Sequence, residues 1–264
     1  MAIGLLTGIL AGKVAFDAIT HFIDFWNSDE YFLKEFKAVP LGSEGAPEQC
    51  KMVQNLARKA EIPAPRLYVI DDPFPNAFAV GRDAEHAAIC LTKGLICNLS
   101  LPEQEGILGH EMTHIKNNDI MVLTAAAFLK DFAVAVVPGA ALETKDAKKM
   151  TSNNQVAVAA ATMLGTMVLG SLMEQALSRN REFAADKGSG ELTGAPDILA
   201  NALERIDKLT ANMVMRGANA NNAHLFLVCP AGVDLKGLFN SHPPVAERAS
   251  RLREQARAMG RLVP

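Results

Sequence analysis

The chain has 264 residues, enough for one large domain or two small ones and for a substantial buried core. Its formal net charge of −3, with acidic and basic residues interspersed, gives no basic field, so we expect no nucleic-acid partner. Hydrophobic residues make up 49% and charged residues 21%, a balance that favours a membrane-associated protein, although an alanine-rich soluble helical protein reaches it too.

Residues 1–26 are apolar but carry charges at Lys13, Asp17 and Asp24, and they fit a cleaved signal peptide poorly. From residue 13 onward the apolar side chains have broadly helical spacing. A helix here is consistent with spanning a membrane, with lying on its surface, or with simple core packing. We therefore distinguish an apolar or amphipathic segment, residues 1–45, from a second unit, residues 46–264.

A helix and a small sheet are expected at the start of the second unit. Residues 47–60 have a helical pattern, which ends at the proline-rich sequence Ile62-Pro63-Ala64-Pro65. Three short segments then alternate with turn sequences and are rich in strand-forming residues: 66–70, 76–80 and 86–92. They predict a small sheet beside the main helices.

A well-formed helix start follows at Ser100. Ser100 is suited to cap the helix, Glu103 stands three residues on as its capping-box partner, and Pro102 lies in the first turn. The helix should run to about Asn118.

Two apolar stretches come next, residues 120–142 and 156–173, separated by a short polar loop. Both are long enough to predict an apolar helical hairpin, 120–175, inserted in a membrane, with a buried soluble hairpin as the alternative. The lysines of the loop give no clear orientation by the positive-inside rule. Beyond the hairpin the patterns predict helices at residues 174–187, 197–209 and 243–258. They also predict one strand, at residues 223–228.

The four cysteines form no C-x-x-C pair: Cys50, Cys90, Cys97 and Cys229. We expect buried, reduced thiols in a cytosol-facing domain rather than disulfides or a metal site.

The sequence Ile107-Leu108-Gly109-His110-Glu111-Met112-Thr113-His114-Ile115 places an H-E-x-x-H motif on the helix that begins near Ser100. A spacing of four residues puts both imidazoles on one helix face, one turn apart, where they can bind one cation. The carboxylate of Glu111 can reach a metal-bound water without binding the metal, and can carry its proton to a leaving amine. The alternative is an ordinary helix with two surface histidines.

A third ligand decides between these interpretations. The metzincin pattern requires a histidine at position 120, which is Ile120 here. The other solution is an acid on a later helix, and Glu182 followed by Asp186 supplies one. Glu182 is suited to bind the metal, while Asp186 is suited to accept a hydrogen bond from a ligand imidazole. The pattern therefore predicts a catalytic zinc site of His110, His114 and Glu182, with one Zn2+ per chain and an open fourth position.

These motifs resemble the HtpX-type membrane zinc metallopeptidases, which are related to the CAAX prenyl proteases. The resemblance extends over roughly residues 46–252, with four motifs in the same order. They are Asn76-Ala77-Phe78-Ala79 with Gly81-Arg82-Asp83, the H-E-x-x-H helix, Ser178 to Asp186, and Ser241-His242-Pro243-Pro244 with Glu247-Arg248. Members usually carry two N-terminal membrane spans, whereas residues 1–26 supply one at most.

The resemblance implies that Glu182 is the third zinc ligand and that one strand binds an extended peptide along its edge. The residues of that strand are Asn76, Ala77, Phe78 and Ala79. A plain core strand is the alternative.

The resemblance also suggests roles near the reaction centre. His242 is a candidate catalytic group that stabilises the oxyanion, and Arg248 is a candidate for bracing the site, with a purely structural role as the alternative for each. Asp119 is either a partner of a ligand imidazole or the solvated end of the metal helix.

We therefore expect a mainly helical α+β fold, a gluzincin-like zinc peptidase domain with a small β-sheet and an apolar hairpin. The expected reaction is hydrolysis of peptide bonds in polypeptide substrates, and the resemblance implies misfolded or damaged proteins. A specific processing protease and a non-catalytic metal-binding scaffold are the alternatives. We expect contact with membrane lipid at the inner cell membrane and an active site facing the cytoplasm, with peripheral attachment as the alternative. The sequence leaves the oligomeric state open.

Overall fold

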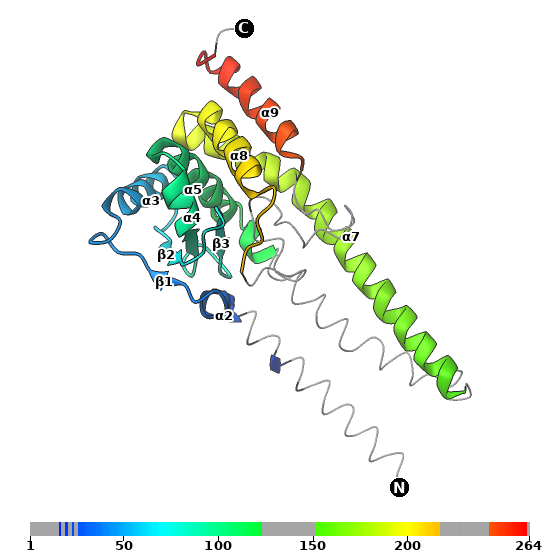
Figure 1. The fold of residues 1–264 in the computed structure, drawn as a ribbon. Coiled ribbons are helices and arrows are strands. Elements are labelled where there is room, and N and C mark those ends of the chain that lie inside the picture. Colours follow the sequence, from blue (N-terminus) through cyan, green and yellow to red (C-terminus); the bar gives the residue numbers. More distant parts are fainter. Residues whose placement is uncertain are drawn as a thin grey trace.

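The computed structural model describes residues 16, 19–20, 23, 26–122, 151–216, 227 and 243–262. In this part of the chain, helices surround a small sheet, and one long helix extends well beyond them (Figure 1). The expected mainly helical fold with a small sheet is confirmed.

Most of the helices were predicted from the sequence. The described helices are α2 (Ser28–Glu35), α3 (Pro47–Ala60), α4 (Lys93–Asn98), α5 (Leu101–Lys116), α7 (Ser152–Thr193), α8 (Pro196–Thr210) and α9 (Val245–Ala258). The predictions for α3, α5, α8 and α9 are confirmed to within about two residues at each end. α2 and α4 were not predicted, because they are only eight and six residues long and therefore too short to show a clear helical period.

The sheet has four strands in the order β1-β2-β4-β3. The strands are β1 (Val39–Pro40), β2 (Arg66–Ile70), β3 (Ala77–Val80) and β4 (Ala88–Thr92). β2 and β4 are parallel, and the outer pairs β1–β2 and β3–β4 are antiparallel. The three expected strands are confirmed, and β1 was missed because two residues carry no alternating pattern. The order places β3 at one edge of the sheet.

The two faces of the sheet pack against different helices. Ile89 and Leu91 of β4 belong to the core that also contains side chains of α3, α5 and α8. Cys90 belongs to a smaller core on the other face, where α2 contributes Phe32 and Leu33 and is followed directly by Phe36. Phe36 and Phe78 of β3 lie with their ring centroids 5.1 Å apart. A strand buried on both faces reads as a continuous apolar run, as β4 does.

One helix joins two segments that were predicted as separate elements. Residues 156–173 and 174–187 were predicted as an apolar hairpin arm followed by a polar helix, and the structure makes both part of α7, which is 42 residues long. It ends at Gly194, whose left-handed backbone (φ 71°) is typical of a helix end. The other hairpin arm, residues 120–142, lies outside the described residues from residue 123 onward.

Among the described residues, no helix combines the length and the hydropathy required to cross a bilayer. In the N-terminal segment, Phe16, Ile19, Ile23 and Trp26 are helical or adjoin a helix and are at least half exposed. The interpretation that this segment simply packs into a core is therefore wrong for these four side chains. The strand expected at residues 223–228 lies outside the described residues except for Leu227.

The cysteines agree only in part with the expectation of buried thiols. The described cysteines are free thiols, of which Cys90 is buried, Cys50 is partly buried and Cys97 is exposed. The expectation is wrong for Cys97, because it lies on the short helix α4, which was not predicted. Cys229 lies outside the described residues.

Candidate metal centre

Helix α5 carries both histidines of the H-E-x-x-H motif into the interior. Its start is the predicted capping box, in which the backbone N–H of Ser100 donates to Glu103 at 2.8 Å. Two turns further on, His110 and His114 are 1% and 7% exposed. The alternative of two surface histidines on an ordinary helix is therefore wrong.

Helix α7 supplies Glu182, and the packing of α7 on α5 depends on two glycines. A side-chain Cβ at Gly109 of α5 would lie 2.8 Å from Ser189 Oγ, and one at Gly188 of α7 would lie 2.5 Å from Thr113 Cγ2. The Ser189 hydroxyl donates across this contact to the Gly106 carbonyl at 2.7 Å. Small residues thus let the two backbones approach closely enough to bring Glu182 to the histidines. Neither glycine was predicted as a contact between helices, although Gly109 immediately precedes the motif.

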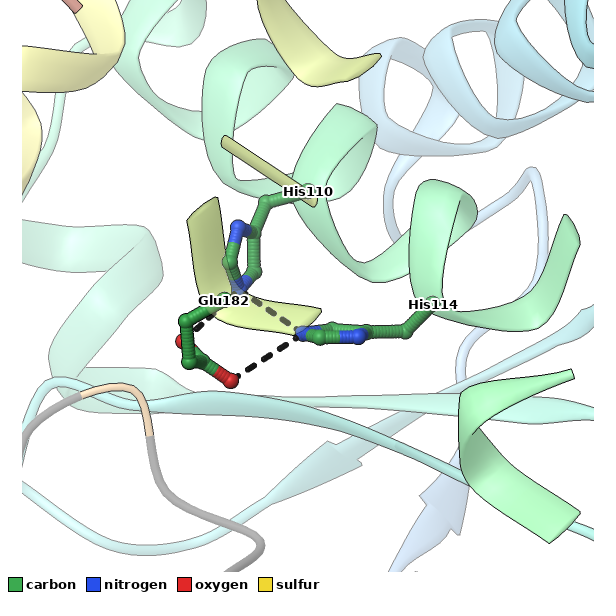
Figure 2. Close-up of side chains that lie close together, drawn as sticks. All are labelled: His110, His114 and Glu182. Carbon is green, nitrogen blue, oxygen red and sulfur yellow. Dashed lines mark hydrogen bonds and ion pairs between the residues drawn. The ribbon is translucent and has the colours of Figure 1, made fainter. Parts of the chain in front are cut away.

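The three side chains meet at one point (Figure 2). The Nε2 atoms of His110 and His114 are 3.1 Å apart. The Glu182 carboxylate lies 3.3 Å from His114 Nε2 and 3.6 Å from His110 Nε2. One ligand atom from each residue lies within 4.8 Å of the others, and all three residues are buried. The structure thus brings together the three residues that the sequence predicts as a metal site.

This donor set fits zinc. The outer Nδ1 atoms of His110 and His114 each lie 3.0 Å from a carboxylate, of Asp186 and Asp119 respectively. When Nδ1–H donates to these acids, both Nε2 lone pairs point inward beside the carboxylate of Glu182. Tetrahedral zinc, with bonds of about 2.0–2.2 Å, separates neighbouring ligand atoms by about 3.3–3.5 Å, close to the observed spacing. Two imidazoles and one carboxylate with a free fourth position are typical of catalytic zinc.

The electrostatics of the centre favour a positive charge. Burial lowers the pKa of His114, but its hydrogen bonds to Asp119 and Glu182 outweigh this effect and raise the pKa to about 10. Asp186 is also buried, which by itself raises its pKa, yet the Arg248 guanidinium and His110 bring the pKa of Asp186 below its usual range. The shift of His114 shows that the neighbouring acids favour a positive charge at this point, and the shift of Asp186 shows that its carboxylate stays charged.

Glu111 lies beside this centre and beside the sheet. It is 4% exposed, and burial raises the pKa of its carboxyl group despite the opposing effect of His110 and His114. The backbone N–H of Ala79 on β3 also acts on the Glu111 carboxylate and opposes this rise in pKa. β3 is thus the edge strand next to Glu111, the residue that the sequence predicts as the catalytic base.

The backbone of β3 has groups facing its outer edge. Asn76 bonds to Thr92 on the β4 side, so the alternation of antiparallel pairs turns the backbone groups of Ala77 and Ala79 away from β4. All four residues from Asn76 to Ala79 are less than 10% exposed.

The remaining predicted residues divide into those that are buried near the metal ligands and one that is not described. Asp119 is buried against His114, so the alternative of a solvated helix end is wrong. Arg248 is fully buried, and its Nε and Nη2 donate to Asp186 at 2.8 and 2.7 Å. His242 lies outside the described residues. Arg181 was not predicted as a site residue, although it stands beside Glu182 in the same motif and its Nε lies 3.5 Å from Asp119.

Comparison with known proteins identifies relatives over most of the chain. Peptidase family M48 matches residues 46–256. A protein named Protease HtpX homolog from Thermococcus kodakarensis is 36% identical, over 97% of this chain and 94% of that protein. Proteins of the same name from Pyrococcus furiosus and Burkholderia multivorans are 36% and 35% identical, over 98% and 90% of this chain.

The fold is also similar to that of a solved structure, the crystal structure of S. mikatae Ste24p. The TM-score is 0.62 at 19% sequence identity, and the match covers 92% of this chain but only 58% of Ste24p. At this identity the likeness concerns the fold alone.

Proposed function

The chain belongs to peptidase family M48 and is a protease, and from this membership we propose that it is a zinc-dependent endopeptidase. The observation that carries the proposal is the convergence of His110, His114 and Glu182 at one buried point. His110 and His114 would hold zinc through Nε2, and Glu182 through its carboxylate. Bound zinc would polarise the scissile carbonyl and increase the acidity of a water molecule.

In the proposed reaction Glu111 accepts a proton from the attacking water and delivers it to the leaving amine. Its raised pKa supports this role, because a higher pKa makes the carboxylate a stronger base toward the attacking water.

We propose that the substrate is an extended polypeptide that pairs with the outer edge of β3. The outward-facing backbone groups of Ala77 and Ala79 support this, because a strand added there would lie beside Glu111. Backbone hydrogen bonds between the substrate and β3 give little specificity for the substrate's side chains. Low specificity suits a protease that degrades misfolded or damaged proteins. The resemblance to HtpX-type enzymes supports that substrate class.

We propose further that the protein is attached to the inner cell membrane with the metal centre on the cytoplasmic side. The support is the apolar composition of residues 120–142 and 156–173 and the exposed apolar side chains near the N-terminus. Alkaline carbonate extraction of membranes tests this proposal. Recovery of the intact chain in the soluble fraction would contradict membrane insertion.

The catalytic proposal is tested with purified protein and casein. We expect cleavage that a zinc chelator abolishes and added zinc restores, and we expect Glu111→Gln to lower the rate at least about 10³-fold while zinc remains bound. Glu105→Gln, on the same helix six residues before Glu111, is the matched control and should cleave normally. Chelator-insensitive cleavage, or an active Glu111→Gln variant, would contradict the mechanism.

A further inference from the structure

Asn76 uses its side chain within the protein. It stands immediately before β3 and is fully buried. Its Oδ1 accepts a hydrogen bond from the backbone N–H of Leu227 at 3.0 Å, and its Nδ2 faces Met215 Sδ at 3.7 Å. Its backbone N–H donates to Thr92 Oγ1 at 2.9 Å. The side chain is therefore directed at segments of the chain more than a hundred residues away, and not at solvent.

The backbone of Leu227 connects Asn76 to Arg248, the buried side chain next to the metal centre. Its carbonyl accepts a hydrogen bond from Arg248 Nη1 at 3.2 Å, while its N–H is held by Asn76. Leu227 itself is 2% exposed. One residue's backbone thus links the side chain at the start of β3 to a side chain of α9.

Arg248 in turn contacts the proposed metal ligand Glu182 and also Asp186, which is the partner of the ligand His110. Beyond Leu227, its guanidinium binds Asp186 through two nitrogens and approaches Glu182 Oε2 at 3.2 Å. Asp186 in turn lies 3.0 Å from His110 Nδ1. A guanidinium is a planar fork with fixed donor directions, so the Leu227 carbonyl helps to set the plane in which Arg248 meets both acids. A fully buried guanidinium also depends on every partner, because a lost one leaves a donor unsatisfied.

We propose that Asn76 is a positioning residue for the metal centre, acting through Leu227 and Arg248 on Asp186 and His110. This inference rests on the zinc site proposed above. It changes the role that the sequence suggested for Asn76, from binding the peptide substrate to aligning the groups that hold the metal ligands. Through these hydrogen bonds, the start of the edge strand β3 is joined to Arg248 and Asp186, which contact the proposed metal ligands.

The two roles of Asn76 predict different measurements. A side chain that binds substrate affects KM and leaves zinc affinity unchanged. A side chain that positions Arg248 affects zinc affinity and kcat, and its effect depends on whether Arg248 is present.

The experiment is a double-mutant cycle on the full chain with Asn76→Ala, Arg248→Lys and the double variant. Zinc affinity is measured by competition with a chromogenic chelator, and the unfolding of the metal-free protein by denaturant. Loss of a group that supports a ligand costs about 10–100-fold in metal affinity. We expect about tenfold for Asn76→Ala, and a double variant no weaker than Arg248→Lys alone. Asn55→Ala, at an exposed position on α3, is the matched control and should bind zinc normally.

Two further measurements keep the result decisive. Asn76→Asp keeps an oxygen acceptor for the Leu227 N–H and should retain most of the zinc affinity, even if Asn76→Ala folds poorly. Non-additive unfolding midpoints in the metal-free protein would report the same coupling without zinc. Additive effects in both measurements, or a raised KM for Asn76→Ala with unchanged zinc affinity, would overturn the inference. Failure to cleave casein by a zinc-loaded protein would contradict the proposed function while leaving this cycle interpretable.

Discussion

Asp119 and Asp186 are not proposed metal ligands, but each contacts the outer nitrogen of a histidine that is one. Asp119 lies 3.0 Å from His114 Nδ1, and Asp186 lies at the same distance from His110 Nδ1. Each bond fixes the ring orientation and the tautomer that presents Nε2 to the centre. The affinity for metal therefore depends on residues beyond the ligands themselves.

This dependence gives a prediction for Asp119. Asp119→Asn keeps the shape of the side chain but removes the charge that favours Nδ1–H on His114, so zinc affinity should fall about 10–100-fold. Competition with a chromogenic chelator measures the change. Asp207→Asn, on the exposed face of α8, is the control. Equal zinc affinities for the two variants would rule out the role of Asp119.

At the scale of elements, the position of Glu182 depends on how closely α5 and α7 approach. Gly188→Ala would place a Cβ 2.5 Å from the Thr113 side chain, so we expect a loss of about 1–3 kcal/mol in the free energy of unfolding. Separation of the helices should also lower zinc affinity. Gly165→Ala, on the same helix with nothing within 4 Å of the added carbon, should not destabilise the protein. Thermal unfolding of both variants tests this contrast.

The pairing of α8 with α9 should weaken in acid. Arg253 donates to both Glu204 oxygens, at 2.7 and 2.9 Å, and this hydrogen bonding lowers the pKa of Glu204. A lowered pKa means that the stabilisation is complete above the unfolded value of about 4.3 and is lost as pH falls through the folded value. Glu204→Gln should therefore cost about 0.2–1 kcal/mol at pH 7, the range of solvent-screened pairs.

Urea unfolding at pH 7 and at about pH 3 compares the wild-type protein with Glu204→Gln. We expect the difference between the two proteins to shrink at the lower pH. A difference that stays constant would show that the charge of Glu204 contributes nothing.

The elements differ in how far the sequence determines them. The helix from Leu101 was predictable because a capping box and an apolar period occur together, and the H-E-x-x-H spacing is a local property of that helix. Glu182 was found because its partner acid stands one turn away on the same helix. The contacts of Asn76 and Arg248 with Leu227 join residues distant in sequence, and no local pattern records them. The short elements β1, α2 and α4 were missed because tertiary packing, and not periodicity, defines them.

At the scale of the whole molecule, zinc would join helices that are distant in the chain. His110 and His114 lie on α5 and Glu182 on α7, so metal binding should stabilise the packed domain. With zinc in excess of about 100 times its Kd, we expect Tm to rise by roughly 5–15 °C over the chelated protein.

Differential scanning calorimetry with and without chelator measures this rise. Glu182→Gln should lose most of it, whereas Glu111→Gln should keep it, because Glu111 is not a proposed ligand. A rise that survives in Glu182→Gln would place the metal elsewhere.

The uninterrupted helix α7 sets the distance between its apolar residues and the proposed metal ligand Glu182. A single helix contains both the apolar residues up to 173 and Glu182, and nine residues of helix rise about 14 Å. If the apolar part lies in a bilayer and α7 stands along the bilayer normal, the scissile bond is held about that far from the lipid. An extended chain covers that distance in about four residues. A membrane-anchored substrate would then be cut no closer to its anchor than this, so the stubs left in the bilayer would have a minimum length set by helix geometry.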